Sequence, residues 1–181
     1  NSLSEVGTME HYLDWLYNIV RSTRDGQVQP LYGIGLERAL PESCVDTVAG
    51  YRGMGPVRIG NQAHEHAQHD VYGSVVLGAA QAFHDRRLMR QADQTDFAAL
   101  EVMGERAWLL HDQPDAGIWE LRSRARVHTS SVLMCWAACD RLARIAQALG
   151  LHERSRHWYA RAATIRTTLL LWKSTARQHP C

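Results

Sequence analysis

The amino-acid sequence predicts an all-α fold built of helical hairpins joined by loops. In five segments, apolar residues recur three and four positions apart, the spacing that gives a helix one buried face. No segment shows a convincing alternation of apolar and polar residues, which is typical of a half-buried β-strand. Glycine and proline gather between the helical segments, where they favour turns and loops.

The first helix is predicted over about residues 9–20, with Thr8 as a suitable N-cap residue. Asp25 and Gly26 end its pattern. A long loop region is predicted over residues 27–59, which contain five glycines and three prolines and show no sustained period. Loops of this length inside a compact domain are usually functional.

Four more helices are expected after this loop. Asn61 can cap a long helix that runs to about Asp85, and small residues on its buried side suit close packing. Further helices are predicted at about residues 95–110, 130–149 and 152–172. Gly150 follows the second of these three, and glycine at that place commonly ends a helix.

Length and composition indicate an ordinary globular protein. A chain of 181 residues corresponds to one domain, and 45% hydrophobic and 22% charged residues are typical values. The net charge of +1, from 20 Lys and Arg against 19 Asp and Glu, argues against a dedicated nucleic-acid or anionic-membrane surface. No apolar run has the length of a membrane span and no signal-peptide pattern is present, so a soluble cytoplasmic protein is expected.

The four cysteines form neither a metal knuckle nor a recognisable disulfide framework. Cys135 and Cys139 lie one helical turn apart in an apolar stripe. Together with Cys44 and Cys181, they are interpreted as small core residues of a protein in a reducing compartment.

Residues 115–122 carry the most distinctive chemistry. Asp115 and Gly117 predict a tight turn, in which Asp115 bonds its own backbone two residues on and Gly117 takes a positive φ. In an extended run after this turn, Trp119 would pack on apolar neighbours and Glu120 would be held on the other side. A carboxyl fixed beside apolar rings has a raised pKa and can act as a general acid.

Arg122 limits this interpretation. A direct pair between Arg122 and Glu120 would lower the pKa of the glutamate, so a catalytic Glu120 requires Arg122 to contact substrate hydroxyls or another acid. The alternative is an ordinary loop glutamate in a surface salt bridge.

Other candidate sites have weaker support. His66 with His69 or Asp70 has the spacing of two metal ligands on one helical face, but no third ligand is evident, so no metal site is predicted. Residues 50–55 are rich in glycine, but no Gly-Lys-Ser/Thr follows, which argues against a phosphate loop. No Gly-x-Ser-x-Gly elbow supports a nucleophilic triad.

Six groups of residues are weak motifs one by one and specific when they are taken together. They are residues 13–16; 32–34 with Glu37 and Arg38; 49–53 with 56–61; Gln68 with 70–73; 117–120 with Arg122; and 134–136 with Asp140 and Arg141. In this order and rough spacing they resemble the bacterial form of glycoside hydrolase family 15, the glucoamylase and trehalase-type enzymes.

This resemblance implies a fold and an activity. The family's fold is an (α/α)6 barrel with its active site in loops at one end, so residues 1–181 are expected to form a single partial barrel domain. The family hydrolyses α-glucosidic bonds of starch-like glucans, dextrins or trehalose with inversion, without a cofactor. Inversion needs one carboxyl that protonates the leaving oxygen and a second that activates water.

By the matching motif, Glu120 is expected to be the general acid. The resemblance also suggests residues that line the sugar site: Arg52, Arg58, Asn61, Gln68, Asp70, Trp119 and Arg122. Polar groups and an aromatic face are what a hydroxyl-rich ring needs for orientation and stacking.

The sequence also departs from the family pattern. Gly35 stands where the family commonly has Asp, and Ser130 and Val132 replace the usual His and Lys before Met-Cys-Trp. Met54 and Gly55 differ in the Tyr-Arg-Gly loop. The resemblance therefore implies a family member whose site has partly diverged.

Two parts of the family's site are expected outside this chain. The arginine-aspartate pair that grips the terminal sugar belongs upstream of Asn1, and the catalytic base belongs downstream of Cys181. The chain is therefore expected to be an internal piece, truncated at both ends and inactive alone. A partial barrel leaves inner-helix surface uncovered, so self-association is also expected.

Two alternatives remain. The chain could be a carbohydrate-binding remnant that keeps the groove and has lost catalysis. It could also be a helical-repeat interaction module, although no motif recurs at the period of about 34 to 40 residues that such arrays show.

Overall fold

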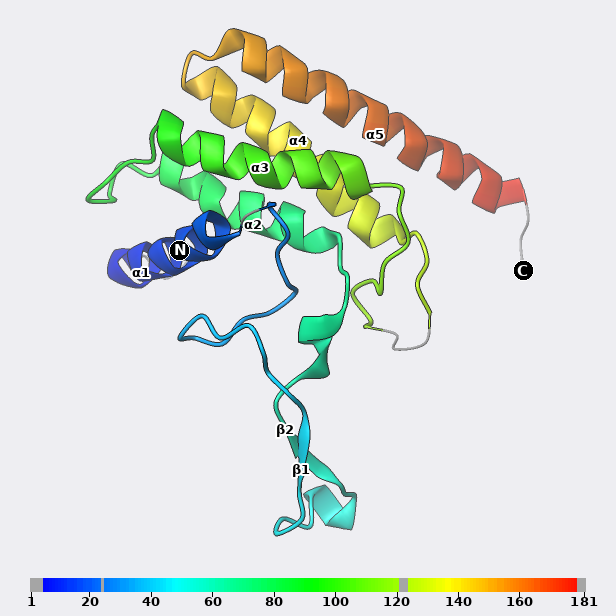
Figure 1. The fold of residues 1–181 in the computed structure, drawn as a ribbon. Coiled ribbons are helices and arrows are strands. Elements are labelled where there is room, and N and C mark those ends of the chain that lie inside the picture. The colour runs from blue at the N-terminus through cyan, green and yellow to red at the C-terminus, as the bar shows by residue number, and fades with distance from the viewer. Residues whose placement is uncertain (1–4, 24, 121–123, 179–181) are drawn as a thin grey trace. The chain divides into compact units, whose positions relative to one another are not determined.

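The computed structural model describes residues 5–23, 25–120 and 124–178, with side chains up to residue 171. These residues contain five α-helices, which confirms the all-α prediction (Figure 1). The helices are α1 (Val6–Ser22), α2 (Asp70–Ala80), α3 (Gln94–Leu110), α4 (Thr129–Ala148) and α5 (His152–Gln178). Contacts group the chain into two compact units, Gln29–Ala67 and the combination of Asn1–Val28 with Gln68–Cys181. A single domain therefore stays a prediction.

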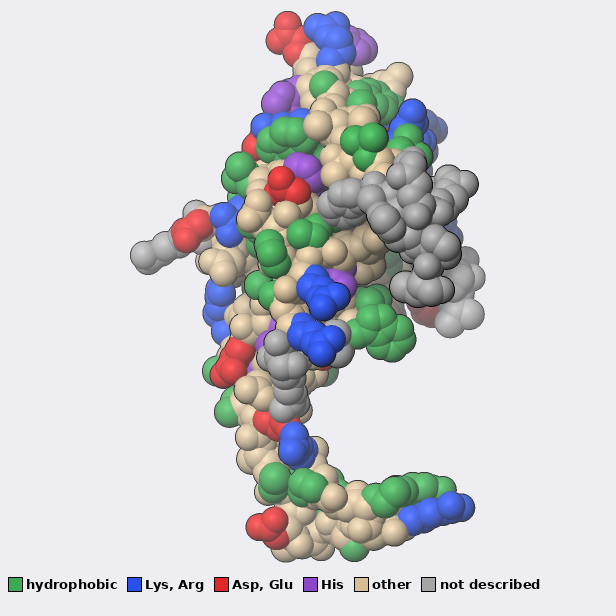
Figure 2. Space-filling view, turned by 90° about the vertical axis from the view of Figure 1, so that its right-hand side faces the viewer, with side chains coloured by type: hydrophobic (Ala, Val, Ile, Leu, Met, Phe, Trp, Pro, Cys, Tyr) green, Lys and Arg blue, Asp and Glu red, His purple; other side chains and the backbone are tan. Residues whose placement is uncertain are grey.

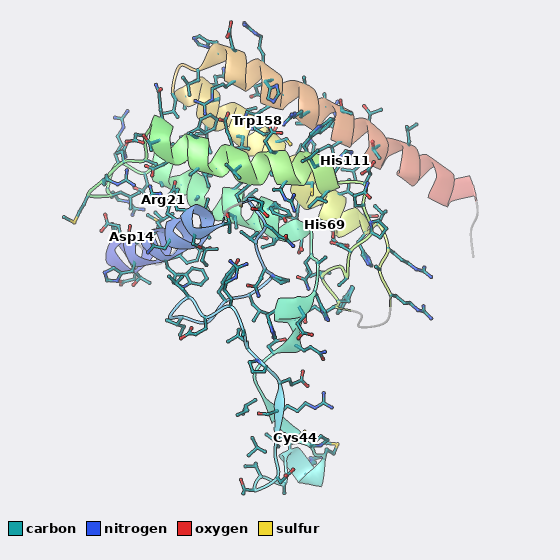
Figure 3. The ribbon with its side chains drawn as sticks, in the orientation of Figure 1. Asp14, Arg21, Cys44, His69, His111 and Trp158 are labelled. Carbon is teal, nitrogen blue, oxygen red and sulfur yellow. The ribbon has the colours of Figure 1, made fainter. Side chains whose placement is uncertain are left out.

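The helical unit has its core between α2, α3, α4 and α5, with α1 against α2 and α3 (Figure 1). Glycines permit the closest approaches. A Cβ on Gly73 would lie 2.3 Å from the Met134 carbonyl oxygen, and one on Gly104 would lie 2.6 Å from the Trp158 ring. Trp158, labelled in Figure 3, is fully buried and donates its indole N–H to Glu101 at 2.8 Å. Small residues thus set the helix spacing, as α2's sequence suggested.

A buried carboxylate connects α1 with the start of α3. Asp96 is 1% exposed and accepts hydrogen bonds from Arg21 of α1 at 2.8 Å and from Arg90 at 2.7 Å. Asp96 also accepts from the backbone N–H of Asp93, which completes a capping box at the N-terminus of α3. Burial alone would raise the pKa of Asp96, but the bonds and charge of Arg90 outweigh it and lower that pKa.

The second unit contains a small antiparallel hairpin. Strand β1 (Ser43–Val45) pairs with β2 (Val57–Ile59), and the short 3-10 helix η1 (Tyr51–Gly53) lies in the connection. The expectation of no β-structure is therefore wrong here. Strands of three residues are too short to show an alternation of apolar and polar residues.

The predicted helix after Asn61 is divided. Asn61 caps only the 3-10 helix η2 (Gln62–Glu65), because its side chain accepts from Ala63 N at 2.9 Å and the chain becomes extended at His66. Helix α2 starts at Asp70 and ends at Ala80, before the 3-10 helix η3 (Gln81–Phe83).

Other helix boundaries also differ from the predictions. Thr8 lies inside α1 and is not its N-cap, and α5 extends past residue 172 to Gln178. In α4, Leu133 is 49% exposed, while Val132 and Cys135 are buried. Helix α4 packs against α2, α3 and α5, and these contacts decide which of its residues are buried.

Cysteine burial agrees with the prediction in α4 only. Cys135 and Cys139 are buried free thiols, and burial raises the pKa of each to about 12. Cys44 is exposed in β1, so its assignment to the core was wrong. Cys181 lies outside the described residues.

The described surface fits the balanced net charge. On the face shown in Figure 2, basic and acidic side chains are interspersed and the described residues form no large patch of one sign. None of the helices in the described ranges has the length and apolar character needed to cross a membrane.

Candidate active site

The loop between α3 and α4, residues 111–128, carries Glu120 and is closed at its base. Asp115 and Arg126 form an isolated antiparallel bridge, with backbone N–H to O distances of 2.9 and 3.0 Å. Gly117 has φ +64°, as the turn prediction required, and a Cβ there would lie 2.6 Å from the His128 ring. Glycine is needed at this position for both its φ and its size.

Glu120 has an unusual backbone conformation. Its φ is +51°, and its N–H donates to the carbonyl of Gly117 at 3.0 Å, so residues 117–120 form a turn. The predicted extended run is therefore wrong over these residues. A glutamate in the left-handed region costs about 1 kcal/mol or more, and such residues cluster at functional sites.

The predicted burial of this segment is also not found. Trp119 is 82% exposed instead of packing on apolar neighbours, and the Glu120 side chain is exposed. The reason is the turn, which curls the chain so that its side chains do not alternate between two faces. An exposed tryptophan beside a carboxyl offers a face on which a sugar ring can stack.

The structure brings Gln68 and Glu120 together, although they lie 52 positions apart. The Gln68 side-chain amide donates to Oε1 of Glu120 at 3.2 Å. One residue predicted to line the sugar site and the predicted general acid thus form one local group.

Asp115 is a site residue that sequence reasoning interpreted differently. It is 1% exposed, and its Oδ2 accepts from the backbone N–H of His69 and from the hydroxyl of Ser131, both at 2.7 Å. The expected bond to its own backbone is thus replaced by bonds to the starts of α2 and α4. No local signal could have shown this, because the partners lie 46 and 16 positions away.

Asp70 begins α2 beside these groups. Burial, followed by the negative charge of Asp115, raises the pKa of Asp70. Its Oδ1 is buried without a hydrogen-bond partner among the described residues. Figure 3 labels the neighbouring His69 where α2 begins. Because its pKa is raised, Asp70 takes up a proton at a higher pH than an ordinary aspartate does.

Three other predicted residues lie in the second unit, described by itself. Arg58 is paired with Glu42 at 2.5 Å, and this hydrogen bond raises the pKa of the arginine. Asn61 is engaged as a cap. The guanidinium of Arg52 lies 5.2 Å from the ring centre of Tyr51, with both side chains exposed. Arg122 lies outside the described residues.

The histidines near the start of α2 were considered as metal ligands. Among the described residues, no group of three or more His, Cys, Asp or Glu side chains is arranged to hold a metal ion.

Comparisons with known proteins identify the family of the chain. Residues 3–179 match the family described as Glycosyl hydrolases family 15. The chain is 36% identical over 144 residues to a trehalase of Mycobacterium tuberculosis, which is 79% of this chain and 21% of that protein. It is 34% identical over 158 residues to a trehalase of Thermoplasma volcanium, which is 87% of this chain and 25% of that protein.

A trehalase of Mycolicibacterium smegmatis is 33% identical over 154 residues, with coverage of 83% of this chain and 23% of the relative. The chain thus spans about a quarter of the length of these curated relatives. No solved structure matches the chain significantly. The family match extends over nearly all of the sequence and includes each motif described above, and the chain therefore belongs to glycosyl hydrolase family 15.

Proposed function

We propose that the protein carrying this chain hydrolyses an α-glucosidic bond with inversion, and that Glu120 is its general acid. The observation that supports this most is the local arrangement of Glu120, a glutamate in a left-handed turn whose carboxyl accepts a bond from Gln68. The names of the relatives favour trehalose as substrate. Dextrins and starch-like glucans are alternative substrates with the same bond type.

In this mechanism Glu120 gives a proton to the glycosidic oxygen as the bond to the anomeric carbon breaks. Water attacks that carbon from the opposite face and loses a proton to a second carboxylate. The family resemblance assigns this base to a motif outside these 181 residues. We therefore expect the 181-residue chain alone to show no sustained hydrolysis.

The remaining site residues have binding roles in this proposal. Trp119 provides a stacking face, while Gln68 and Asp70 contact sugar hydroxyls from the start of α2. Arg52, Arg58, Asn61 and Arg122 are further candidates. Residues 1–181 are proposed to be part of one (α/α)6 barrel domain, as the family match suggests.

The test is Glu120→Gln in the full natural protein. Because the amide cannot donate an acid proton, we expect kcat on trehalose to fall about 10² to 10⁴-fold, with substrate binding retained. Glucose release measures the rate, and NMR of the first anomer released tests inversion. Glu153→Gln, an exposed glutamate in α5, is the matched control. Equal rates for the two variants would contradict the role of Glu120.

A carbohydrate-binding remnant is the second candidate, and the exposure of Glu120 favours it. A general acid is usually partly shielded from water, which this carboxyl is not. In that case calorimetry would show trehalose or maltodextrin binding that Glu120→Gln leaves unchanged, without hydrolysis by the natural protein. Hydrolysis that depends on Glu120 would exclude this candidate.

A further inference from the structure

We propose that Asp115 is a positioning residue, whose buried carboxylate holds the start of α2 and the 111–128 loop in the arrangement that joins Gln68 to Glu120. The inference rests on the proposed function. Asp115 has no contact with a reacting atom in this proposal, and it acts through the residues that it holds.

Asp115 connects three segments that are distant in sequence. Its backbone closes the loop with Arg126, its Oδ2 accepts from His69 N, and the same oxygen accepts from Ser131 Oγ. Both side-chain bonds are 2.7 Å long and lie away from water. Hydrogen bonds to an ionised acceptor are about twice as strong as neutral ones, so this carboxylate is a firm attachment point.

The bonded positions adjoin the proposed chemistry. His69 lies between Gln68 and Asp70, so a bond to its N–H places both residues at the start of α2. Glu120 lies five residues after Asp115 in the loop that Asp115 closes. The 3.2 Å bond between Gln68 and Glu120 therefore joins two segments that the same carboxylate holds.

The connection through Asp115 is buried. The Cys135 thiol approaches the His69 carbonyl at 3.4 Å, which covers this connection from the α4 side. The second oxygen of Asp115, Oδ1, is buried and has no hydrogen-bond partner in the described part of the chain. The position of the segments that Asp115 bonds matters for the reaction, because a shift of about 1 Å in groups remote from the reacting atoms can cost about 100-fold in rate.

The experiment compares Asp115→Asn with Asp112→Asn, an exposed aspartate of the same loop, in the full natural protein. We expect Asp115→Asn to lower kcat on trehalose about 10 to 100-fold with KM changed less than about threefold. Ser131→Ala, which removes one of the two side-chain bonds, should lower kcat less. It also provides the same comparison if Asp115→Asn does not fold.

A double-mutant cycle separates positioning from a structural role. If Asp115 acts through Gln68, adding Asp115→Asn to Gln68→Ala should lower kcat little further. Independent effects that multiply would overturn the inference. An Asp115→Asn variant that has a lower melting temperature but the same kcat as Asp112→Asn would also overturn the inference.

Amide hydrogen exchange of residues 67–71 and 116–120 provides a readout that needs no activity. We expect faster exchange in both segments for Asp115→Asn than for Asp112→Asn, and equal exchange would overturn the inference. A natural protein inactive on all α-glucosides would instead contradict the proposed function, while the exchange data would still decide whether Asp115 holds these segments.

Discussion

At the scale of single residues, the site depends on backbone conformations that few side chains adopt. Glu120 has φ +51° and Gly117 has φ +64°, three residues earlier in the same turn. The left-handed region is strained for glutamate and unstrained for glycine. In this turn Gly117 adopts a positive φ without strain, whereas Glu120 adopts one with strain. The turn holds the Glu120 carboxyl near Gln68.

The turn predicts a strong effect of Gly117→Ala. The added Cβ would lie 2.6 Å from His128 and would need a positive φ, so we expect a loss of about 2 to 3 kcal/mol in unfolding free energy. Gly150→Ala is the control, because Gly150 has φ +75° with no atom within 4 Å of the new Cβ. Urea unfolding of the natural protein measures both variants, and equal losses would show that the His128 contact contributes nothing.

At the scale of elements, α1 is attached to α3 by ion pairs around Asp96. Arg21 and Arg90 both contact this carboxylate, which is 1% exposed, although the two arginines remain partly in water. The exposure of the arginines matters, because they can be solvated if the aspartate is lost. The cost of removing Asp96 is therefore smaller than for a fully buried pair.

Asp96→Asn should lower the unfolding free energy by about 1 to 3 kcal/mol at pH 7. The folded pKa of Asp96 lies below its unfolded value of about 3.9, so its stabilisation is present above about pH 4. It is lost as the pH falls through the folded pKa. Urea unfolding at pH 7, 5 and 3 should show equal differences from wild type at pH 7 and 5 and a smaller difference at pH 3.

Asp140→Asn provides the control for this pH series. Asp140 forms an i,i+4 pair with Arg144 along α4, and such pairs contribute about 0.5 kcal/mol or less. A difference between wild type and Asp96→Asn that is the same at pH 7 and pH 3 would contradict the assignment of the stabilisation to ionised Asp96.

At the scale of the whole molecule, the family assignment concerns a chain that covers about a quarter of its relatives. The described helical unit has large apolar side chains on its surface, among them Leu109 of α3 and Leu133 of α4. In a complete barrel, helices of this kind are covered by neighbouring hairpins. We therefore expect residues 1–181 alone to expose more apolar surface than the proposed barrel would.

The isolated 181-residue chain should accordingly self-associate. Sedimentation velocity over a range of concentrations is expected to show an increase in mean mass, and Leu133→Ser should reduce it. Met89→Ser is a control, since Met89 is 94% exposed in the connection before α3 and belongs to no helix. A monomer at all concentrations would contradict this prediction.

The helical class, the approximate positions of α1, α3, α4 and α5, and the family motif that contains Glu120 were predictable from the sequence. These features depend on local spacing and local motifs, which a single sequence displays. The tertiary structure decided that Asn61 caps only η2, that Leu133 faces outward, and that residues 43–45 pair with 57–59. It also decided that Gln68 reaches Glu120 and that Asp115 bonds His69 and Ser131. These contacts join residues 16 to 52 positions apart, and only packing of the chain brings such residues within hydrogen-bond distance.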